Sequence, residues 1–169
     1  MYLHTNMNKN IINYMQLRVA RQVLNIGVRE LANILRVSKA TANNAELGKT
    51  RDFLHKHNPA LLDFFRSRNL IFPNEYCIRH YIKSEKRIYN FADLTRFQLK
   101  AARCFMGMKQ YELAQIINTG KGVISRAEHL ENTSFINPLN KSIIPKLYDL
   151  FSDNNISFTD NLSICYKRK

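Results

Sequence analysis

The chain contains the same unit twice. Residues 16–21, QLRVAR, recur 82 positions later as residues 98–103, QLKAAR. At the same spacing residues 30–35, ELANIL, match residues 112–117, ELAQII, and 11 of the 31 residue pairs that start at positions 16 to 46 are identical. Because this period is far longer than the unit of a stacked repeat protein, each copy is expected to be a small domain of its own.

The match continues to the end of the chain after an insertion of four residues in the second copy. Residues 61–65, LLDFF, match residues 147–151, LYDLF, at a spacing of 86, and Ile78 matches Ile164 at the same spacing. The duplication therefore covers nearly all 169 residues. We predict a first domain over residues 10–83, a linker over 84–94 and a second domain over 95–169.

Apolar residues at helical spacing predict a mainly α fold. The predicted helices of the two copies are a first helix around 17–24 and 99–106, a second over 28–35 and 110–117, a third over 39–47 and 121–130, and later helices ending in 60–68 and 144–152. Gly27 and Gly107 are predicted to end the first helices. Ser38 is predicted to cap the third helix of the first copy, and Pro59 is expected in the first turn of a helix.

Each copy ends in a short segment that reads as a β-strand. Apolar and polar residues alternate over residues 75–83 and again over residues 161–167. A single short strand is not stable alone, so each needs a partner. The sequence leaves two pairings open: the two strands with each other, or each with the same strand of another chain.

The charge of the chain restricts its partners. Lys and Arg total 26 against 13 Asp and Glu, which gives a net charge of +13. Such an excess is typical of proteins that bind nucleic acid or an anionic membrane surface, and also of some soluble proteins with no polyanionic partner. No apolar run approaches the roughly 20 residues of a membrane span. We therefore expect a soluble, intracellular protein without membrane attachment.

The reactive side chains indicate no cofactor. Cys77, Cys104 and Cys165 lie far apart and form no C-x-x-C pair, so neither a zinc knuckle nor a redox dithiol is predicted. Acidic residues are scattered, and no motif typical of hydrolases or nucleotide-binding enzymes is present. We expect neither an enzyme nor a bound metal.

A short helix, a tight turn and a second short helix describe a helix-turn-helix. At these residues the chain resembles the Cro/C1-type (XRE) family of phage-repressor-like regulators. The matching segments are LRVAR (17–21), RELA (29–32), VSKAT (37–41) and AELGKT (45–50) in the first copy, and LKAAR (99–103), QYELA (110–114) and VISRAE (123–128) in the second. The resemblance implies two tandem lambda-repressor-like helix-turn-helix domains, each followed by a short β-strand, in a protein of the bacterial cytoplasm associated with the nucleoid.

The same resemblance assigns residues to double-stranded DNA. The third helix of each copy would enter the major groove and contact base edges. The residues carried over as base contacts are Lys39, Ala40, Thr41, Asn43 and Asn44 in the first copy and Lys121, Gly122, Val123, Ser125 and Arg126 in the second. The residues carried over as phosphate contacts are Arg29, Lys49, Thr50, Arg51 and Gln110. The family's glutamine at the start of the second helix is matched by Gln110, whereas the first copy has Val28.

Two charged pairs are given a structural role by the resemblance. Arg21 and Glu46 are 25 residues apart, and so are Arg103 and Glu128. In the family these positions form a partly buried ion pair that fixes the angle of the third helix. We expect both pairs to be structural ion pairs.

The expected function is sequence-specific DNA binding in transcriptional regulation. The alternative is a protein-interaction module, antitoxin-like or polymerase-associated, in which DNA binding is weak or lost in one copy. Val28 and Gly122, where the family pattern weakens, keep this alternative open. The chain is expected to act either as a homodimer or as an internal pseudo-dimer held by its tail strands.

Overall fold

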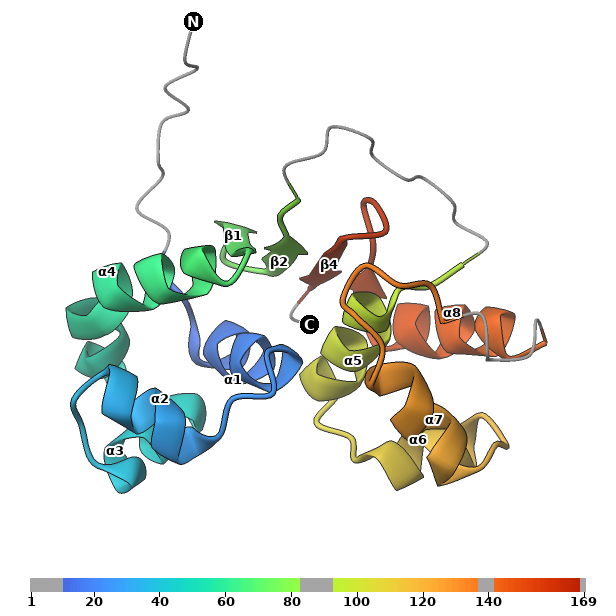
Figure 1. The fold of residues 1–169 in the computed structure, drawn as a ribbon, viewed down its shortest axis with the longest axis horizontal. Coiled ribbons are helices and arrows are strands. Elements are labelled where there is room, and N and C mark those ends of the chain that lie inside the picture. Colours follow the sequence, from blue (N-terminus) through green and yellow to red (C-terminus); the bar gives the residue numbers. More distant parts are fainter. Residues whose placement is uncertain (1–10, 83–92, 137–141, 168–169) are drawn as a thin grey trace, which may run out of the picture.

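The protein is mainly helical, with a small antiparallel sheet at the junction of its two halves (Figure 1). The computed structural model describes residues 11–82, 93–136 and 142–167. The first half, residues 11–82, holds α1 (Tyr14–Val23), α2 (Val28–Ile34), α3 (Lys39–Glu46), α4 (Arg51–Ser67), β1 (Leu70–Asn74) and β2 (Cys77–His80). The second half, residues 93–167, holds α5 (Arg96–Phe105), α6 (Gln110–Ile116), α7 (Lys121–Glu128), α8 (Ile143–Asp153), β3 (Ile156–Ser157) and β4 (Ser163–Tyr166).

The two halves repeat the same order of elements, and their backbones agree at the turns. Asn25 and Gly107, which are equivalent at the spacing of 82, both have a positive φ, of 60° and 71°. Arg36 and Asn118 are equivalent at the same spacing and have φ of 53° and 54°. A left-handed conformation is uncommon outside glycine, so its recurrence at these turns supports the duplication read from the sequence.

The first helices end differently from the prediction in one copy. Gly107 has the left-handed conformation that closes α5, as predicted. In the first half this position belongs to Asn25, and Gly27 instead precedes α2 as its N-cap with φ of −73°. Asparagine tolerates the left-handed region better than most residues, so the first copy needs no glycine there.

Pro59 lies in the middle of a helix and not in its first turn. α4 runs from Arg51 to Ser67 without a break, over 17 residues, and Pro59 is its ninth residue. Proline lacks the N–H that would bond to the carbonyl four residues earlier. The prediction of a separate helix beginning near Pro59 was therefore wrong, whereas Pro145 does lie in the first turn of α8.

The tail of each half is a hairpin and not a solitary strand. β1 pairs with β2 and β3 pairs with β4, both antiparallel. The two hairpins join through β2 and β4 into a four-stranded sheet of order β1-β2-β4-β3. β1 and β3 were not predicted, because the residues of β1, LIFPN, do not alternate between apolar and polar and β3 has two residues. Of the two pairings that the sequence left open, the chain adopts the pairing of its two tail strands with each other.

The β2–β4 pairing relates the two halves by an approximate twofold axis. Ile78 faces Ile164, and these two residues are equivalent in the repeat. On either side Cys77 faces Cys165 and Arg79 faces Ser163. Exchanging the halves maps this antiparallel pairing onto itself, as at an isologous dimer interface. α1 and α5, the equivalent first helices, also lie against each other beneath the sheet (Figure 1).

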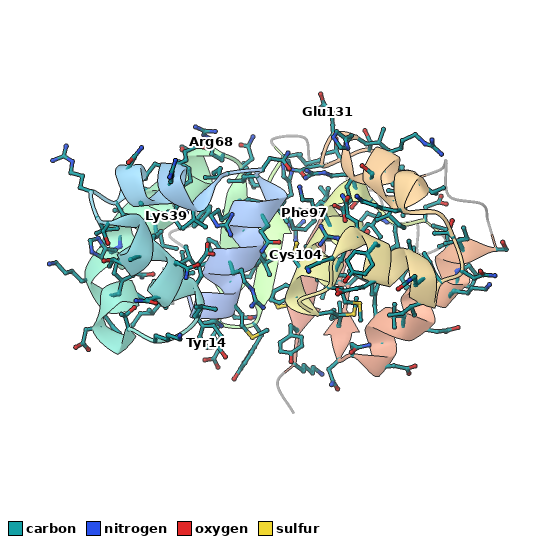
Figure 2. All side chains as sticks on the ribbon, turned by 90° about the horizontal axis from the view of Figure 1, so that it is seen from below. Tyr14, Lys39, Arg68, Phe97, Cys104 and Glu131 are labelled. Atoms are coloured by element: carbon teal, nitrogen blue, oxygen red, sulfur yellow. A yellow bond between two sulfur atoms is a disulfide. The ribbon has the colours of Figure 1, made fainter. Side chains whose placement is uncertain are left out.

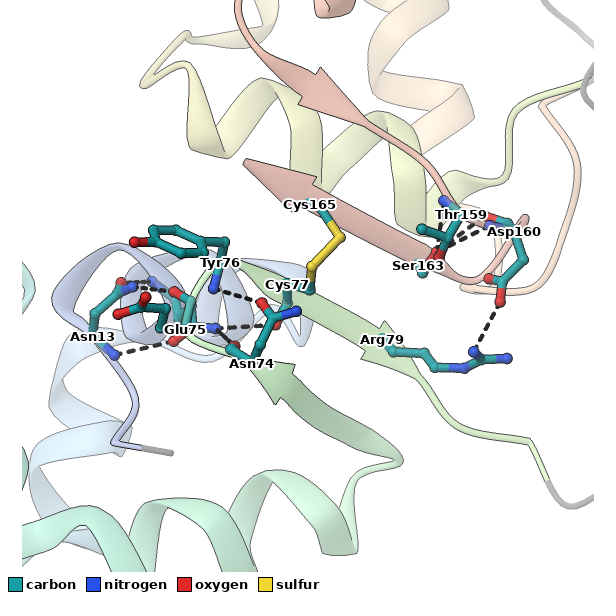
Figure 3. Close-up of a disulfide and its surroundings, with 11 residues drawn as sticks. Asn13, Asn74, Glu75, Tyr76, Cys77, Arg79, Thr159, Asp160, Ser163 and Cys165 are labelled. Atoms are coloured by element: carbon teal, nitrogen blue, oxygen red, sulfur yellow. Dashed lines mark hydrogen bonds and ion pairs between the residues drawn. A yellow bond between two sulfur atoms is a disulfide. The ribbon is translucent and has the colours of Figure 1, made fainter. Parts of the chain in front are cut away.

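A disulfide bond joins the halves beside this axis (Figure 3). Cys77 and Cys165 are 88 residues apart in sequence, but the register of β2 and β4 brings their Cα atoms to 4.1 Å. This bond was not predicted, because the two cysteines lie far apart in the sequence and form no C-x-x-C pair. Cys104 is the free cysteine of the chain and is buried.

One apolar cluster extends through both halves. It includes Leu17 and Leu31 in the first half and their equivalents Leu99 and Leu113 in the second, all fully buried. Leu94 is also fully buried, so the second half begins before residue 95, and most of the predicted linker lies outside the described residues. Among the described residues no helix combines the length and the apolar character that a membrane crossing requires.

Candidate nucleic-acid interface

α3 is held by its apolar side and exposes its polar side. Ala42 and Ala45 are fully buried, and the Ser38 hydroxyl accepts a hydrogen bond from the Thr41 backbone N–H at 3.0 Å, the predicted N-cap. Of the five predicted base-contacting residues of this helix, Lys39, Ala40 and Asn43 are exposed, and Thr41 and Asn44 are half-buried.

α7 is arranged in the same way with different side chains. Ile124 and Ala127 are fully buried, and Gly120 provides no side-chain cap, as its residue type predicts. Of the five predicted base-contacting residues, Lys121, Gly122 and Arg126 are exposed, and Val123 and Ser125 are half-buried. Val123 packs against the apolar cluster, so only part of its side chain is accessible for a contact with DNA.

Both predicted ion pairs are present and tie the first helix of each half to the end of the third. Arg21 bonds Glu46 through Nε and Nη2, the latter at 2.9 Å, while its Nη1 donates to the Ile26 carbonyl at 2.6 Å. Arg103 bonds Glu128 through the same two nitrogens, at 2.5 and 2.8 Å. The carboxylates of Glu46 and Glu128 are almost completely buried, so each pair fixes the position of a third helix relative to its neighbours.

The second copy has an additional brace that the first lacks. The Gln110 side-chain amide donates to Oε2 of Glu128 at 2.9 Å, which links the start of α6 to the end of α7. In the first half this position is Val28, which has no polar side-chain atom. This bracing hydrogen bond is therefore present in one copy alone. A phosphate oxygen accepts hydrogen bonds, so the predicted phosphate contact would use the second N–H of the Gln110 amide.

The remaining predicted phosphate contacts differ in accessibility. Arg29 and Lys49 are exposed, which suits contact with a polyanion. The Thr50 hydroxyl is buried and has no hydrogen-bond partner among the described residues, so it contacts a phosphate only if the chain around it moves. The side chain of Arg51 lies outside the described residues, although its backbone begins α4.

α3 and α7 lie on the same side of the molecule, away from the sheet (Figure 1). Figure 2, seen from that side, shows Lys39 among the outward side chains of the first half. Since the approximate twofold axis passes between α1 and α5, it also relates α3 to α7. The structure thus places the two helices that carry the predicted base-contacting residues on the same side of the molecule, one in each half.

The comparisons with known proteins add no family. No protein-family model, no curated protein and no solved structure matches the chain. In the part of the chain that the structure describes, no group of three His, Cys, Asp or Glu side chains is arranged to hold a metal ion.

Sequence reasoning also missed a group of polar residues buried where the halves meet. Arg96 and Lys100 on α5 are 3% and 8% exposed, and both bond to residues at the end of α1. Helical spacing alone cannot distinguish these cations from surface lysines and arginines. The repeat alignment offers one sign that Arg96 is unusual. Its equivalent in the first copy is Tyr14, which carries no charge.

Proposed function

We propose that this protein is a sequence-specific DNA-binding transcriptional regulator of the Cro/C1-type helix-turn-helix class. The observation that carries the proposal is the pair of short helices α3 and α7, which begin with exposed Lys39 and Lys121 on one face of a strongly basic chain. In this reading α3 and α7 are recognition helices, and α2 and α6 are the helices that support them.

The exposed side chains of the two helices suit different base pairs. Lys39 can donate to guanine O6 and N7, and Asn43 can form two hydrogen bonds with adenine. On α7 the base contacts would be made by Lys121 and Arg126, because Gly122 has no side chain. An operator read by both helices would therefore consist of two unlike half-sites.

The internal twofold axis supports binding by a single chain. Regulators of this class usually place two recognition helices in successive major grooves about 34 Å apart by forming a dimer. Here the β2–β4 pairing and the α1–α5 contact relate two such helices within one chain. We infer that one chain covers both half-sites as an internal pseudo-dimer.

Binding to duplex DNA tests the proposal directly. In fluorescence anisotropy with a labelled random duplex, the affinity is expected to fall steeply as salt rises, because phosphates are neutralised and counterions released. Selection from a random pool is then expected to recover an asymmetric site whose two halves are centred about 10 base pairs apart. If no DNA binds even at low salt, the alternative function, a protein-interaction module, is favoured instead.

A further inference from the structure

A polar pocket opens between the two halves on one flank of the molecule. Its volume is about 370 Å³. The first half lines it with the end of α1 at Val23 and Asn25, with Asn69 and with His80. The second half lines it with Arg96 of α5 and with the loop after α7, residues 130–133. We call this cavity the junction pocket.

Arg96 lines the junction pocket and has hydrogen-bond donors that no group of the described residues occupies. Its Nη1 donates to the Val23 carbonyl at 2.8 Å and to the Asn132 side-chain oxygen, and its Nε donates to the Glu128 carbonyl at 3.0 Å. All these acceptors are uncharged oxygens. Among the described residues Nη2 has no hydrogen-bond partner, so two N–H groups of a buried guanidinium remain unused.

The positive charges around Arg96 exceed the negative charges. Lys100 is buried beside Arg96 and donates to the side-chain oxygen of Asn25. The buried carboxylate that interacts with both cations, that of Glu128, already accepts two hydrogen bonds from Arg103 and one from Gln110. Arg96, Lys100 and Arg103 thus share this one buried carboxylate. Burial, with Arg96 adding to it, accordingly lowers the pKa of Lys100 to about 8.

The walls of the pocket offer further donors. The Asn132 side-chain oxygen accepts from Arg96, which turns its amide N–H₂ group to other partners. Nδ1 of His80 is buried without a hydrogen-bond partner among the described residues. An unpaired buried polar atom is costly, and in the tautomer that carries the proton on Nδ1 this nitrogen would donate a hydrogen bond to a bound oxyanion. Among the residues that the structure describes, Glu131 is the one acid that lines the pocket, and it is exposed.

We propose that the junction pocket binds a small molecule through a phosphate or carboxylate group placed against Arg96. An oxyanion there would accept from Nη2 of Arg96 and from the Asn132 amide and would offset the surplus positive charge of Arg96 and Lys100. Charge-assisted hydrogen bonds of this kind are the strong ones. Since the first half and the second half both line the pocket, the bound molecule would also stabilise their junction.

The equivalent flank of the pseudo-dimer does not share these features. There Tyr14 occupies the position of Arg96 and Tyr166 that of His80, and the pocket they line is smaller, about 170 Å³, and includes Glu75. Figure 2 shows Tyr14 and Glu131 at opposite edges of the molecule. The duplication thus created two equivalent positions, and the chemistry that suits an anion is present at one of them.

The test uses the full chain without DNA, so its outcome is independent of the proposed DNA binding. Inorganic phosphate and citrate are titrated separately into isotopically labelled protein in low-chloride buffer, and backbone amide shifts are followed by NMR. Saturable shifts are expected at Asn25, Asn69 and residues 130–133. The stronger of the two anions identifies which oxyanion the pocket prefers. No saturation by 20 mM of either anion, or shifts confined to α3 and α7, would overturn the proposal.

Two variants and one matched control complete the test. Asn69→Asp adds a negative charge to the pocket wall while keeping a residue that tolerates the φ of 61° at this position, and at least a fivefold loss of affinity is expected. Glu131→Gln removes a negative charge and is expected to tighten binding two- to fivefold. Asn155→Asp changes the equivalent position on the other flank, with φ of 59°, and is expected to leave the affinity unchanged. Equal effects of Asn69→Asp and Asn155→Asp would refute the site.

Discussion

The Cys104 thiol donates a hydrogen bond to the side-chain oxygen of Gln22, with 2.9 Å between Sγ and Oε1. These two residues are equivalent in the repeat, 82 positions apart, so their contact marks the point where the approximate twofold axis crosses the α1–α5 interface. Ile78 and Ile164 mark its crossing of the sheet. The halves therefore meet as the two subunits of a symmetric dimer would, within one chain.

The thiol of Cys104 is expected to be unreactive in the folded protein. Its side chain is buried, and burial raises its pKa, which disfavours the nucleophilic thiolate. Titration with a thiol reagent at pH 8 should detect no thiol in the native oxidised protein, one after unfolding in denaturant, and three after unfolding and reduction. Rapid reaction of a native thiol would contradict the buried α1–α5 contact.

Reduction of the Cys77–Cys165 bond is expected to lower the free energy of unfolding by about 4–5 kcal/mol. The bond closes a loop of 88 residues, and in the chain-entropy model a loop of this length restricts the unfolded state by that amount. The measurement is urea unfolding of a Cys104→Ala variant with and without dithiothreitol. The strand pairing and the α1–α5 contact persist without the bond, so the reduced protein should remain folded.

A cleavage experiment checks the same bond independently of stability. A protease site inserted within residues 84–92 divides the chain between the two bonded cysteines. After cleavage the fragments should migrate together on a gel without reductant and separate with it. Separation without reductant would show that the bond is absent.

Loss of one member of a buried ion pair should destabilise the fold strongly. Arg21→Ala leaves the buried carboxylate of Glu46 without its cation, which costs about 3–5 kcal/mol, and specific DNA binding should be lost with the position of α3. The double variant Arg21→Met, Glu46→Leu removes both charges and should be more stable than the single variant, measured by thermal and urea unfolding. Full stability of Arg21→Ala would contradict the role assigned to this pair.

The stability contributed by Lys100 should depend on pH. Its pKa is lowered to about 8 in the folded chain, by burial first and then by Arg96, against an ordinary value of about 10.4 in the unfolded chain. Between these two values the unfolded state binds more protons, so the free energy of unfolding rises with pH. Below pH 8 both states carry the charge and this contribution is flat.

The comparison that isolates this effect uses Cys104→Ala and Cys104→Ala, Lys100→Met. The alanine removes the thiol, whose raised pKa acts in the opposite direction. The difference in unfolding free energy between the two proteins should shift in favour of the lysine-containing protein from pH 8 to pH 10. A difference that does not change over this range would show that Lys100 keeps an ordinary pKa.

Substitutions on the two proposed recognition helices should affect separate half-sites. Asn43→Ala is expected to cost about 1–3 kcal/mol of binding and to relax base preference in one half-site, and Arg126→Ala should do the same in the other. Lys146→Ala on α8 removes an exposed charge outside these helices and should weaken binding only slightly and without a change of preference. Equal relaxation in both half-sites by either recognition variant would contradict an internal pseudo-dimer.

The sequence alone determined the duplication and the short helices, because each depends on residues close together in the chain or on a spacing that recurs. The two ion pairs, Arg21 with Glu46 and Arg103 with Glu128, were expected from the family resemblance, and both are present. The capping of α3 by Ser38 is likewise a local property, since a side-chain oxygen satisfies an N–H three residues away.

Only the tertiary structure decided how the two copies meet. Antiparallel pairing of β2 with β4 brings together Cys77 and Cys165, and the crossing of α1 with α5 buries Arg96 and Lys100 beside Asn25. No pattern in the sequence predicts either contact. Each joins residues more than 70 positions apart, and their proximity depends on strand register and helix orientation. The disulfide and the junction pocket are therefore products of that packing.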